Sequence, residues 1–354
     1  MNKDLYPEIT LDIVRVTEAA ALMSSIYLGF GNKEAVDGAA VDAMRGMLDY
    51  IDIKGTIIIG EGEKDEAPML YIGEKVGNWK ESAEEMDLAV DPIDGTRLVA
   101  YGLPNAISVM VAAEKNQIAS LPTFYSYKIA CGPELKGKLD INASIRENLK
   151  VAAAALGTDV SELTVVILNR DRHRAIIEEV RSTGARIKLI GDGDIAGAIA
   201  TAMPDTGVDL YIGIGGSPEG VLAAGALRTL EGEIQTKLWP SNDEEKKYIE
   251  ENNIDLNKVY FTEDLVGGDH VIFAATGVTD GDFLKGVKYL KGKAITESIS
   301  MRTSSSTIRK ITTIHNLKNK TIKLKTLDGD EKLINISKAE ERLNILKNFN
   351  FVNK

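Results

Sequence analysis

From about residue 140, the chain alternates short apolar runs with amphipathic segments of helical length, and this alternation restricts the possible folds more than any other feature. The expected strands lie at 163–168, 186–190 and 208–213, and the expected helices at 143–156, 172–183, 194–203 and 218–230. Such a pattern is typical of an α/β unit built around a mostly parallel sheet. Ligands of these sheets lie at the carboxyl ends of the strands, so the residues that follow each strand are candidates for a site.

The first 140 residues have a different pattern, which predicts an α+β subdomain. Apolar residues at helical spacing predict helices over 8–28 and 33–51. Runs of β-forming residues predict strands at 55–60, 88–90, 105–113, 117–122 and 126–131, the last three as an antiparallel meander. We expect Pro92 to end the strand at 88–90, because proline cannot donate a ladder hydrogen bond.

The C-terminal residues are polar and rich in β-branched side chains. They predict a charged helix at 241–253, a strand at 269–277, polar strands within 295–326, a hairpin turn at 328–330 and a terminal helix at 337–348. We therefore expect three parts. Residues 1–140 form a metal-binding subdomain, 141–290 form a substrate-binding α/β subdomain, and 291–354 return strands to the first subdomain before the terminal helix.

Composition narrows the class of protein. With 354 residues, 44% of them hydrophobic, the chain can bury a sizeable core. Its formal net charge of -11 argues against nucleic acid as a partner. No stretch approaches the roughly 20 apolar residues of a membrane span, and the N-terminal residues lack a signal-peptide pattern, so we expect a cytoplasmic protein with no membrane partner. The single cysteine, Cys131, excludes an intrachain disulfide.

The segment 91–96, with the sequence DPIDGT, places two carboxylates and a hydroxyl directly after an apolar strand. Gly95 tolerates unusual backbone angles, so a tight loop is expected here. Asp91, Asp94 and Thr96 then converge as oxygen ligands for a divalent cation. The alternative is a turn in which both aspartates only cap the helix that follows.

Two further acids are candidates for the same site. Glu61 follows the strand at 55–60 and opens a second acid-rich loop. Acids packed so densely repel one another unless solvent or a cation neutralises them, so a charged loop and a metal site both remain open. Asp37 falls in the first turns of the helix at 33–51, where it can instead complement the helix dipole.

Polar residues also gather at the strand ends of the second half. Arg170 and Arg172 offer forked donors to a phosphate. Asp192 and Asp194 follow the next strand and can accept hydrogen bonds from sugar hydroxyls. The glycine-rich turn at 213–216 precedes a helix whose N-terminal amides favour anions. Taken singly, these residues are also consistent with helix caps and a connecting turn.

The combination indicates metal-assisted hydrolysis of a phosphate ester, in which cations stabilise charge on the transferring group and activate a water. Oxygen-only ligands favour Mg²⁺ or Mn²⁺. The acidic candidates for metal ligation are Asp37, Glu61, Asp91, Asp94 and Glu219.

Four segments together resemble the class II fructose-1,6-bisphosphatases: GEGEKDEAPML at 60–70, DPIDGT at 91–96, DGD at 192–194 and GIGGSPEG at 213–220. The resemblance runs from about residue 5 to 325. It implies the layered α-β-α-β-α fold of the inositol-monophosphatase-like superfamily. It also implies hydrolysis of the 1-phosphate of fructose 1,6-bisphosphate in gluconeogenesis. Some relatives also accept sedoheptulose 1,7-bisphosphate.

The resemblance assigns roles position by position. It implies metal ligation by the five acids named above and places Thr96 where the family orients or activates the attacking water. The implied catalytic residues are Thr96, Asp37 and Glu61. The implied substrate contacts are Lys33, Asp94, Gly95, Thr96, Tyr125, Arg170, Asp171, Arg172, Asp192, Gly193, Asp194 and Gly216. Position 94 is usually glutamate in the family, and Asp94 is the form of the wider superfamily.

Other functions fit parts of the pattern. A superfamily phosphatase of inositol or nucleotide phosphates would use the same metal site. A dinucleotide-binding oxidoreductase could use the glycine turn at 213–220, and a non-catalytic sensor would bind a sugar phosphate without releasing phosphate. We expect a small sugar bisphosphate as the substrate and a homo-oligomer, either a dimer or a tetramer.

Overall fold

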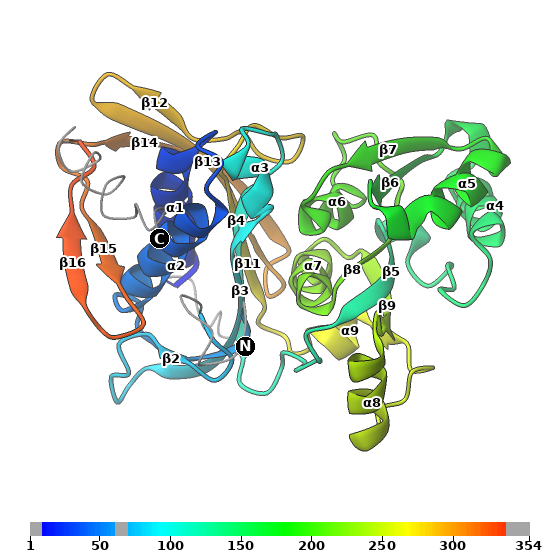
Figure 1. Cartoon of the computed structure of the whole chain (residues 1–354), viewed down its shortest axis with the longest axis horizontal. Helices are drawn as coiled ribbons and strands as arrows, with labels where there is room; N and C mark the ends of the chain where they lie inside the picture. Colours follow the sequence, from blue (N-terminus) through cyan, green and yellow to red (C-terminus); the bar gives the residue numbers. More distant parts are fainter. Residues whose placement is uncertain (1–8, 61–69, 338–354) are drawn as a thin grey trace. The chain divides into compact units, whose positions relative to one another are not determined.

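The computed structural model describes residues 9–60 and 70–337, so the predicted helix at 337–348 falls almost wholly outside the described residues. The chain forms two compact units (Figure 1). The first contains residues 1–115 and 272–354, and the second contains residues 116–271. Among the described residues, no helix is long and apolar enough to span a membrane.

A mixed sheet is the framework of the first unit. Its strands are ordered β12-β13-β11-β4-β3-β1-β2, with β14 paired to β13. The strand bounds are β1 Ile53–Ile59, β2 Lys75–Val76, β3 Glu84–Asp94, β4 Ile107–Glu114, β11 Ile272–Gly277, β12 Lys288–Leu290, β13 Lys293–Arg302 and β14 Thr307–Asn316. Strands β1 and β3 run parallel, and the other described pairs are antiparallel.

Two helices, α1 (Ile9–Ser24) and α2 (Lys33–Leu48), lie together on one face of this sheet, as Figure 1 shows. Their buried faces join β-strand side chains such as Ile57 and Leu88 in one apolar core. The start of α2 is fixed because the Asn32 side chain accepts a hydrogen bond from the Ala35 amide at 3.0 Å. This cap places residues 33–37 in the first turn or so of a helix with a buried inner face.

A hairpin of β15 (Ile322–Lys325) and β16 (Glu331–Ile334) packs on α2. Gly46 permits this close approach, because a Cβ there would lie 2.2 Å from the Lys323 carbonyl oxygen. The predicted turn at 328–330 is confirmed, with Gly329 at φ 87°. The left-handed angle explains the glycine at that position.

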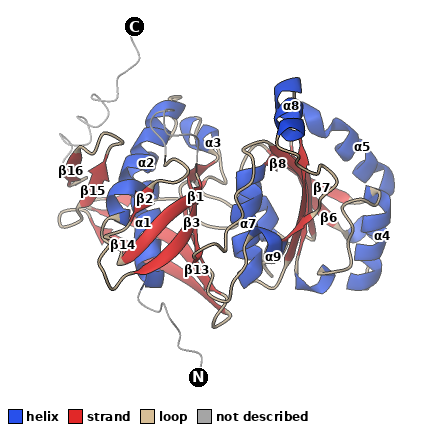
Figure 2. Cartoon of the chain, turned by 90° about the horizontal axis from the view of Figure 1, so that it is seen from below, coloured by secondary structure: helices blue, strands red, loops and turns tan. Residues whose placement is uncertain are grey.

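The second unit has three layers, with a sheet between two pairs of helices (Figures 1 and 2). Helices α4 (Ile145–Leu156) and α5 (Arg174–Thr183) cover one face, and α6 (Asp194–Ala200) and α7 (Ser217–Thr229) cover the other. The sheet order is β10-β9-β5-β8-β6-β7. Its strands are β5 Tyr125–Cys131, β6 Thr164–Leu168, β7 Arg186–Ile190, β8 Leu210–Gly216, β9 Glu233–Trp239 and β10 Tyr260–Phe261. Helices α8 (Asp243–Glu251) and α9 (Thr262–Leu265) complete it.

The predicted α/β class is confirmed, but the mostly parallel sheet of the second half needs correction. Strand β6 is parallel to β7 and β8, whereas β5 runs antiparallel to both β8 and β9. The helix-connected strands β6 to β9 therefore point the same way, as the alternation predicts. Strand β5 enters from before the alternating region and inserts between β8 and β9, which no local pattern reveals.

Three predictions about strands in the first 140 residues are wrong. Residues 117–122 form only an isolated bridge between Ile118 and Val266, and β4 and β5 lie in different sheets instead of one meander. Strand β3 continues through Pro92 to Asp94. Proline is tolerated because β1 pairs with β3 only as far as Ala89 and the ladder with β4 is irregular between Asp91 and Asp94.

Candidate functional site

The end of β3 carries the acidic segment of the first unit. Asp91 pairs with Val109 and Asp94 with Ile107, so β3 has one extra residue in a bulge between the two aspartates. Bulges of this kind re-aim side chains and are frequent beside active sites. The Asp91 carboxylate accepts a hydrogen bond from the Ile93 amide at 3.0 Å, which fixes the turn within the bulge.

Gly95 and Thr96 connect this bulge to helix α3 (Thr96–Ala100). Gly95 has φ 89°, and a Cβ there would lie 2.7 Å from Leu98 Cδ1. Only glycine satisfies both constraints without strain. Thr96 therefore begins the helix directly after the acidic strand end.

Thr96 and Asp37 are in direct contact. Thr96 Oγ1 donates a hydrogen bond to Asp37 Oδ1 at 2.7 Å, which joins the end of β3 to the first turns of α2. Burial raises the pKa of Asp37, while the Thr96 hydroxyl and the positive charge of Lys33 oppose the rise. The Asp37 carboxylate thus sits where protein donors compensate its charge only in part.

The donors of the first unit suit a hard divalent cation. Asp37, Asp91, Asp94 and Thr96 offer only oxygen atoms, and Asp94 is buried at 5% exposure. Within residues 9–60 and 70–337, no three acidic, histidine or cysteine side chains form a group that could hold a metal on their own. Glu61, the remaining candidate of this unit, lies outside the described residues, and Glu219 belongs to the second unit.

In the second unit, the turn after β6 is fastened to strand β8. Arg172 Nε donates to the Ile214 carbonyl at 2.9 Å, and the Ile214 amide donates to His173 Nε2 at 2.7 Å. Burial, above all, lowers the pKa of His173 to about 4, so the ring is neutral at physiological pH and accepts this bond. The Arg172 guanidinium lies over the Tyr125 ring at 4.4 Å from its centre.

The other predicted residues after β6 and β7 have different surroundings. Arg170 Nη2 lies 3.3 Å from Asp192 Oδ1, which links the turns after β6 and β7. Asp171 is exposed and accepts a hydrogen bond from Arg174 Nη2 at 2.9 Å, as a residue at a helix start commonly does. Gly193 has φ 82° at the N-cap of α6, where glycine is favoured.

Asp194 and Glu219 begin helices α6 and α7 and lie close to the end of β8. Asp194 Oδ2 accepts a hydrogen bond from the buried Lys128 Nζ at 2.8 Å. A Cβ at Gly216 would lie 2.0 Å from Glu219 Oε2, so a larger residue there would displace the Glu219 carboxylate. Burial and the nearby Asp194 raise the pKa of Glu219, and Lys128 opposes this shift. Glu219 is therefore a second acid whose charge the protein compensates incompletely.

Sequence reasoning missed Lys128 and His173. Lys128 interrupts the apolar run of β5, and a single lysine within such a run is the signal that could have identified it. His173 directly follows the predicted residue Arg172, but nothing local indicates that it faces the core. Their contacts depend on how β5, β8 and the turn after β6 pack together, which no local pattern indicates.

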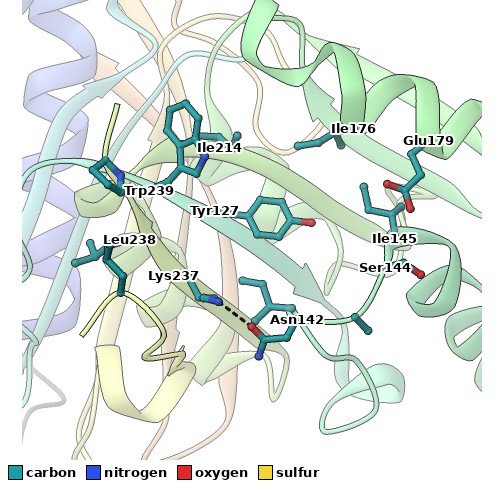
Figure 3. Close-up of a pocket in the computed structure, with 14 residues that line it drawn as sticks. Tyr127, Asn142, Ser144, Ile145, Ile176, Glu179, Ile214, Lys237, Leu238 and Trp239 are labelled. Atoms are coloured by element: carbon teal, nitrogen blue, oxygen red, sulfur yellow. Dashed lines mark hydrogen bonds between the residues drawn. The ribbon is translucent and has the colours of Figure 1, made fainter. Parts of the chain in front are cut away.

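A cavity of about 590 Å³ opens on the α4 and α5 side of the second unit (Figure 3). Tyr127, Ile176, Glu179 and Trp239 are among the residues that line it, and none of the predicted site residues that the structure describes does. Trp239 also packs against Tyr125, with the ring centres 6.3 Å apart. Trp239 therefore links this cavity to Tyr125, the aromatic residue that supports Arg172.

Comparisons with known proteins show which family the chain resembles. Residues 7–315 match the family model described as bacterial fructose-1,6-bisphosphatase, glpX-encoded. A class 2 fructose-1,6-bisphosphatase of Haemophilus influenzae is 47% identical over 322 residues, which cover 87% of this chain and 96% of that protein. The fructose-1,6-bisphosphatase 1 class 2 of Escherichia coli (strain K12) is 46% identical over 326 residues, covering 88% and 96%.

Proposed function

The chain belongs to the family of glpX-encoded bacterial fructose-1,6-bisphosphatases, and we propose that it hydrolyses the 1-phosphate of fructose 1,6-bisphosphate to fructose 6-phosphate and inorganic phosphate. The reaction would serve gluconeogenesis in the cytoplasm. Within the chain, the hydrogen bond between Thr96 and Asp37 at 2.7 Å supports this proposal most directly. It joins a hydroxyl to a carboxylate in the unit that also contains Asp91 and Asp94.

The carboxylates of the first unit would hold the divalent cation. Asp37, Asp91 and Asp94 provide oxygen ligands, with Glu61 and Glu219 as the further ligands that the family resemblance implies. When bound, the cation supplies positive charge to the transferring phosphoryl group and to the attacking water. The raised pKa values of Asp37 and Glu219 support this role, because an added positive charge would favour their ionised forms.

Thr96 orients the attacking water in this proposal. Its hydroxyl hydrogen is directed to Asp37, so the lone pairs of Oγ1 remain able to accept a hydrogen bond from water. A water held in this way has its own lone pair free for the phosphorus atom. Asp37 fixes the direction of the hydroxyl and, as the water attacks, would accept the Thr96 hydroxyl proton while Thr96 Oγ1 takes a proton from the water.

The second unit binds the sugar phosphate. Arg172, held by Ile214 and by the Tyr125 ring, presents its remaining N–H groups to a phosphate in a fixed direction. Arg170, which pairs with Asp192, would supply a second guanidinium to the phosphate. Asp192 and Asp194 accept hydrogen bonds from sugar hydroxyls, and Gly216 allows a phosphate oxygen to approach the backbone. Lys33, Gly95, Asp171 and Gly193 complete the contacts that the resemblance implies.

Asp94 is expected to influence the choice of metal. Its side chain is one methylene shorter than the glutamate usual at this position, so its carboxylate reaches roughly 1.3 Å less far. This difference is a large fraction of a Mg²⁺–oxygen distance of about 2.1 Å. Mg²⁺ demands near-ideal octahedral geometry, so a looser site favours Mn²⁺. We predict higher activity with Mn²⁺ than with Mg²⁺ and a smaller difference in the Asp94→Glu variant.

Phosphate release measured with each metal at saturation tests this prediction. An unchanged ratio of Mn²⁺ to Mg²⁺ activity in Asp94→Glu would show that position 94 does not set the preference. Tm measured with and without each metal separates lost binding from lost catalysis.

A phosphate-release assay with a substrate panel tests the function itself. We expect fructose 1,6-bisphosphate to be preferred, with sedoheptulose 1,7-bisphosphate as the second candidate and inositol or nucleotide phosphates well behind. Binding of fructose 1,6-bisphosphate without phosphate release, in the presence of Mn²⁺ and Mg²⁺, would instead indicate a sensor. Sedimentation in the same buffers tests the proposed homo-oligomer.

A further inference from the structure

Lys128 lies in the middle of strand β5 and is 1% exposed. Its side chain runs on the face of the sheet that α6 and α7 cover, because a Cβ built on Gly220 of α7 would lie 3.3 Å from Lys128 Cε. Lysine is almost never fully buried unless its charge is paired. The position therefore requires an explanation beyond packing.

The pairing of Lys128 is specific to one oxygen atom. Lys128 Nζ donates to Asp194 Oδ2 at 2.8 Å, and the Tyr211 hydroxyl lies 3.4 Å from the same oxygen. Among the described residues, no donor meets Asp194 Oδ1. One oxygen of the carboxylate is thus held inside the unit, and the other is left for a different partner.

Gly215 completes this arrangement. A Cβ at Gly215 would lie 1.9 Å from Asp194 Oδ2, so any larger residue would push the carboxylate away from Lys128. Strand β8 therefore leaves space for Asp194 on the side from which the lysine reaches it. Three elements, β5, β8 and α6, converge on a single carboxylate oxygen.

We propose that Lys128 is a positioning residue, which holds Asp194 in one orientation so that Oδ1 accepts a hydrogen bond from a hydroxyl of the sugar. This assignment rests on the proposed function. Lys128 itself does not touch the substrate. Neither arginine that we assign to phosphate is held by Asp194, because Arg172 contacts Ile214 and Tyr125 and Arg170 pairs with Asp192. Loss of Lys128 should therefore weaken recognition of the sugar and leave recognition of phosphate intact.

The test compares Lys128→Met with the wild-type enzyme by kcat and KM for fructose 1,6-bisphosphate and by competitive inhibition with inorganic phosphate. We expect KM to rise about tenfold or more, as for loss of a hydrogen bond to a charged group, and kcat to fall by a smaller factor, because Lys128 also opposes the raised pKa of Glu219. The inhibition constant for phosphate should stay within about twofold of wild type. Lys323→Met removes a lysine paired with Asp49 at 2.7 Å in the first unit, and it should change neither constant.

Lys128→Met leaves the buried Asp194 carboxylate without its charge partner, which can impair folding. A double-mutant cycle therefore serves as the second test. If Lys128 acts through Asp194, Asp194→Asn and Asp194→Asn/Lys128→Met should have equal KM values. A further rise in KM in the double variant would overturn the assignment, as would parallel losses of sugar and phosphate affinity in Lys128→Met. An inactive wild-type enzyme would instead overturn the proposed function and this assignment together.

Discussion

Glu219→Gln is expected to lower kcat by about 10³-fold or more, because a divalent cation contributes several kcal/mol of charge stabilisation to phosphoryl transfer. The amide has the shape of the carboxylate but lacks its charge, so the variant removes one ligand without opening a cavity. Phosphate release at saturating metal and substrate measures the effect. Turnover close to wild type would exclude Glu219 as an essential ligand.

The same substitution should not destabilise the metal-free protein. Burial and Asp194 raise the folded-state pKa of Glu219 above its unfolded value. A group with a raised pKa stabilises the fold at low pH, and this contribution is lost as pH rises through the folded-state pKa. Glutamine has no charge to lose, so at neutral pH the Tm of metal-free Glu219→Gln should equal or exceed that of wild type. Glu233→Gln, in buried strand β9, is the matched control and should keep its turnover.

Local sequence patterns predict the helices and strands of this chain better than they predict which elements lie beside one another. The helix expected at 33–51 is α2 at Lys33–Leu48, because its apolar spacing and the Asn32 cap are both local signals. Strand β9 was not predicted, since Gln235 and Thr236 occupy buried positions where an apolar run would be expected. Their partners come from distant segments, as when Gln235 Nε2 donates to the Leu139 carbonyl.

The residue types of the candidate site are likewise predictable from the sequence, whereas their arrangement is not. The type of residue at a strand end is visible in the sequence, so Asp91, Asp94 and Thr96 could be selected before any geometry was known. The bulge that re-aims them could not, because it depends on the register between β3 and β4. The role of Lys128 is even harder to predict from the sequence, because it depends on three elements that meet only in the folded unit.

The contact between Thr96 and Asp37 carries the most specific prediction about the chemical step. Thr96→Ala is expected to lower kcat about 10²-fold or more and to change KM little, because the hydroxyl acts on the attacking water and not on the substrate. In this variant, Asp37 Oδ1 would lose the hydrogen bond that Thr96 Oγ1 donates to it. Steady-state kinetics at saturating Mn²⁺ and at saturating Mg²⁺ measure both constants, and a metal titration shows whether Asp37 still binds.

Two variants separate the hydroxyl from the shape of the side chain. Thr96→Ser keeps the Oγ and its bond to Asp37, so its kcat should stay within about tenfold of wild type, whereas Thr96→Val keeps the shape and should resemble Thr96→Ala. Thr96 is half-buried and begins the short helix α3, so valine also tests for damage to that helix. A raised KM with an unchanged kcat in Thr96→Ala would reassign Thr96 to substrate binding. The water would then have to be oriented by another group, with Asp37 as the nearest candidate because it already accepts the hydrogen bond from Thr96.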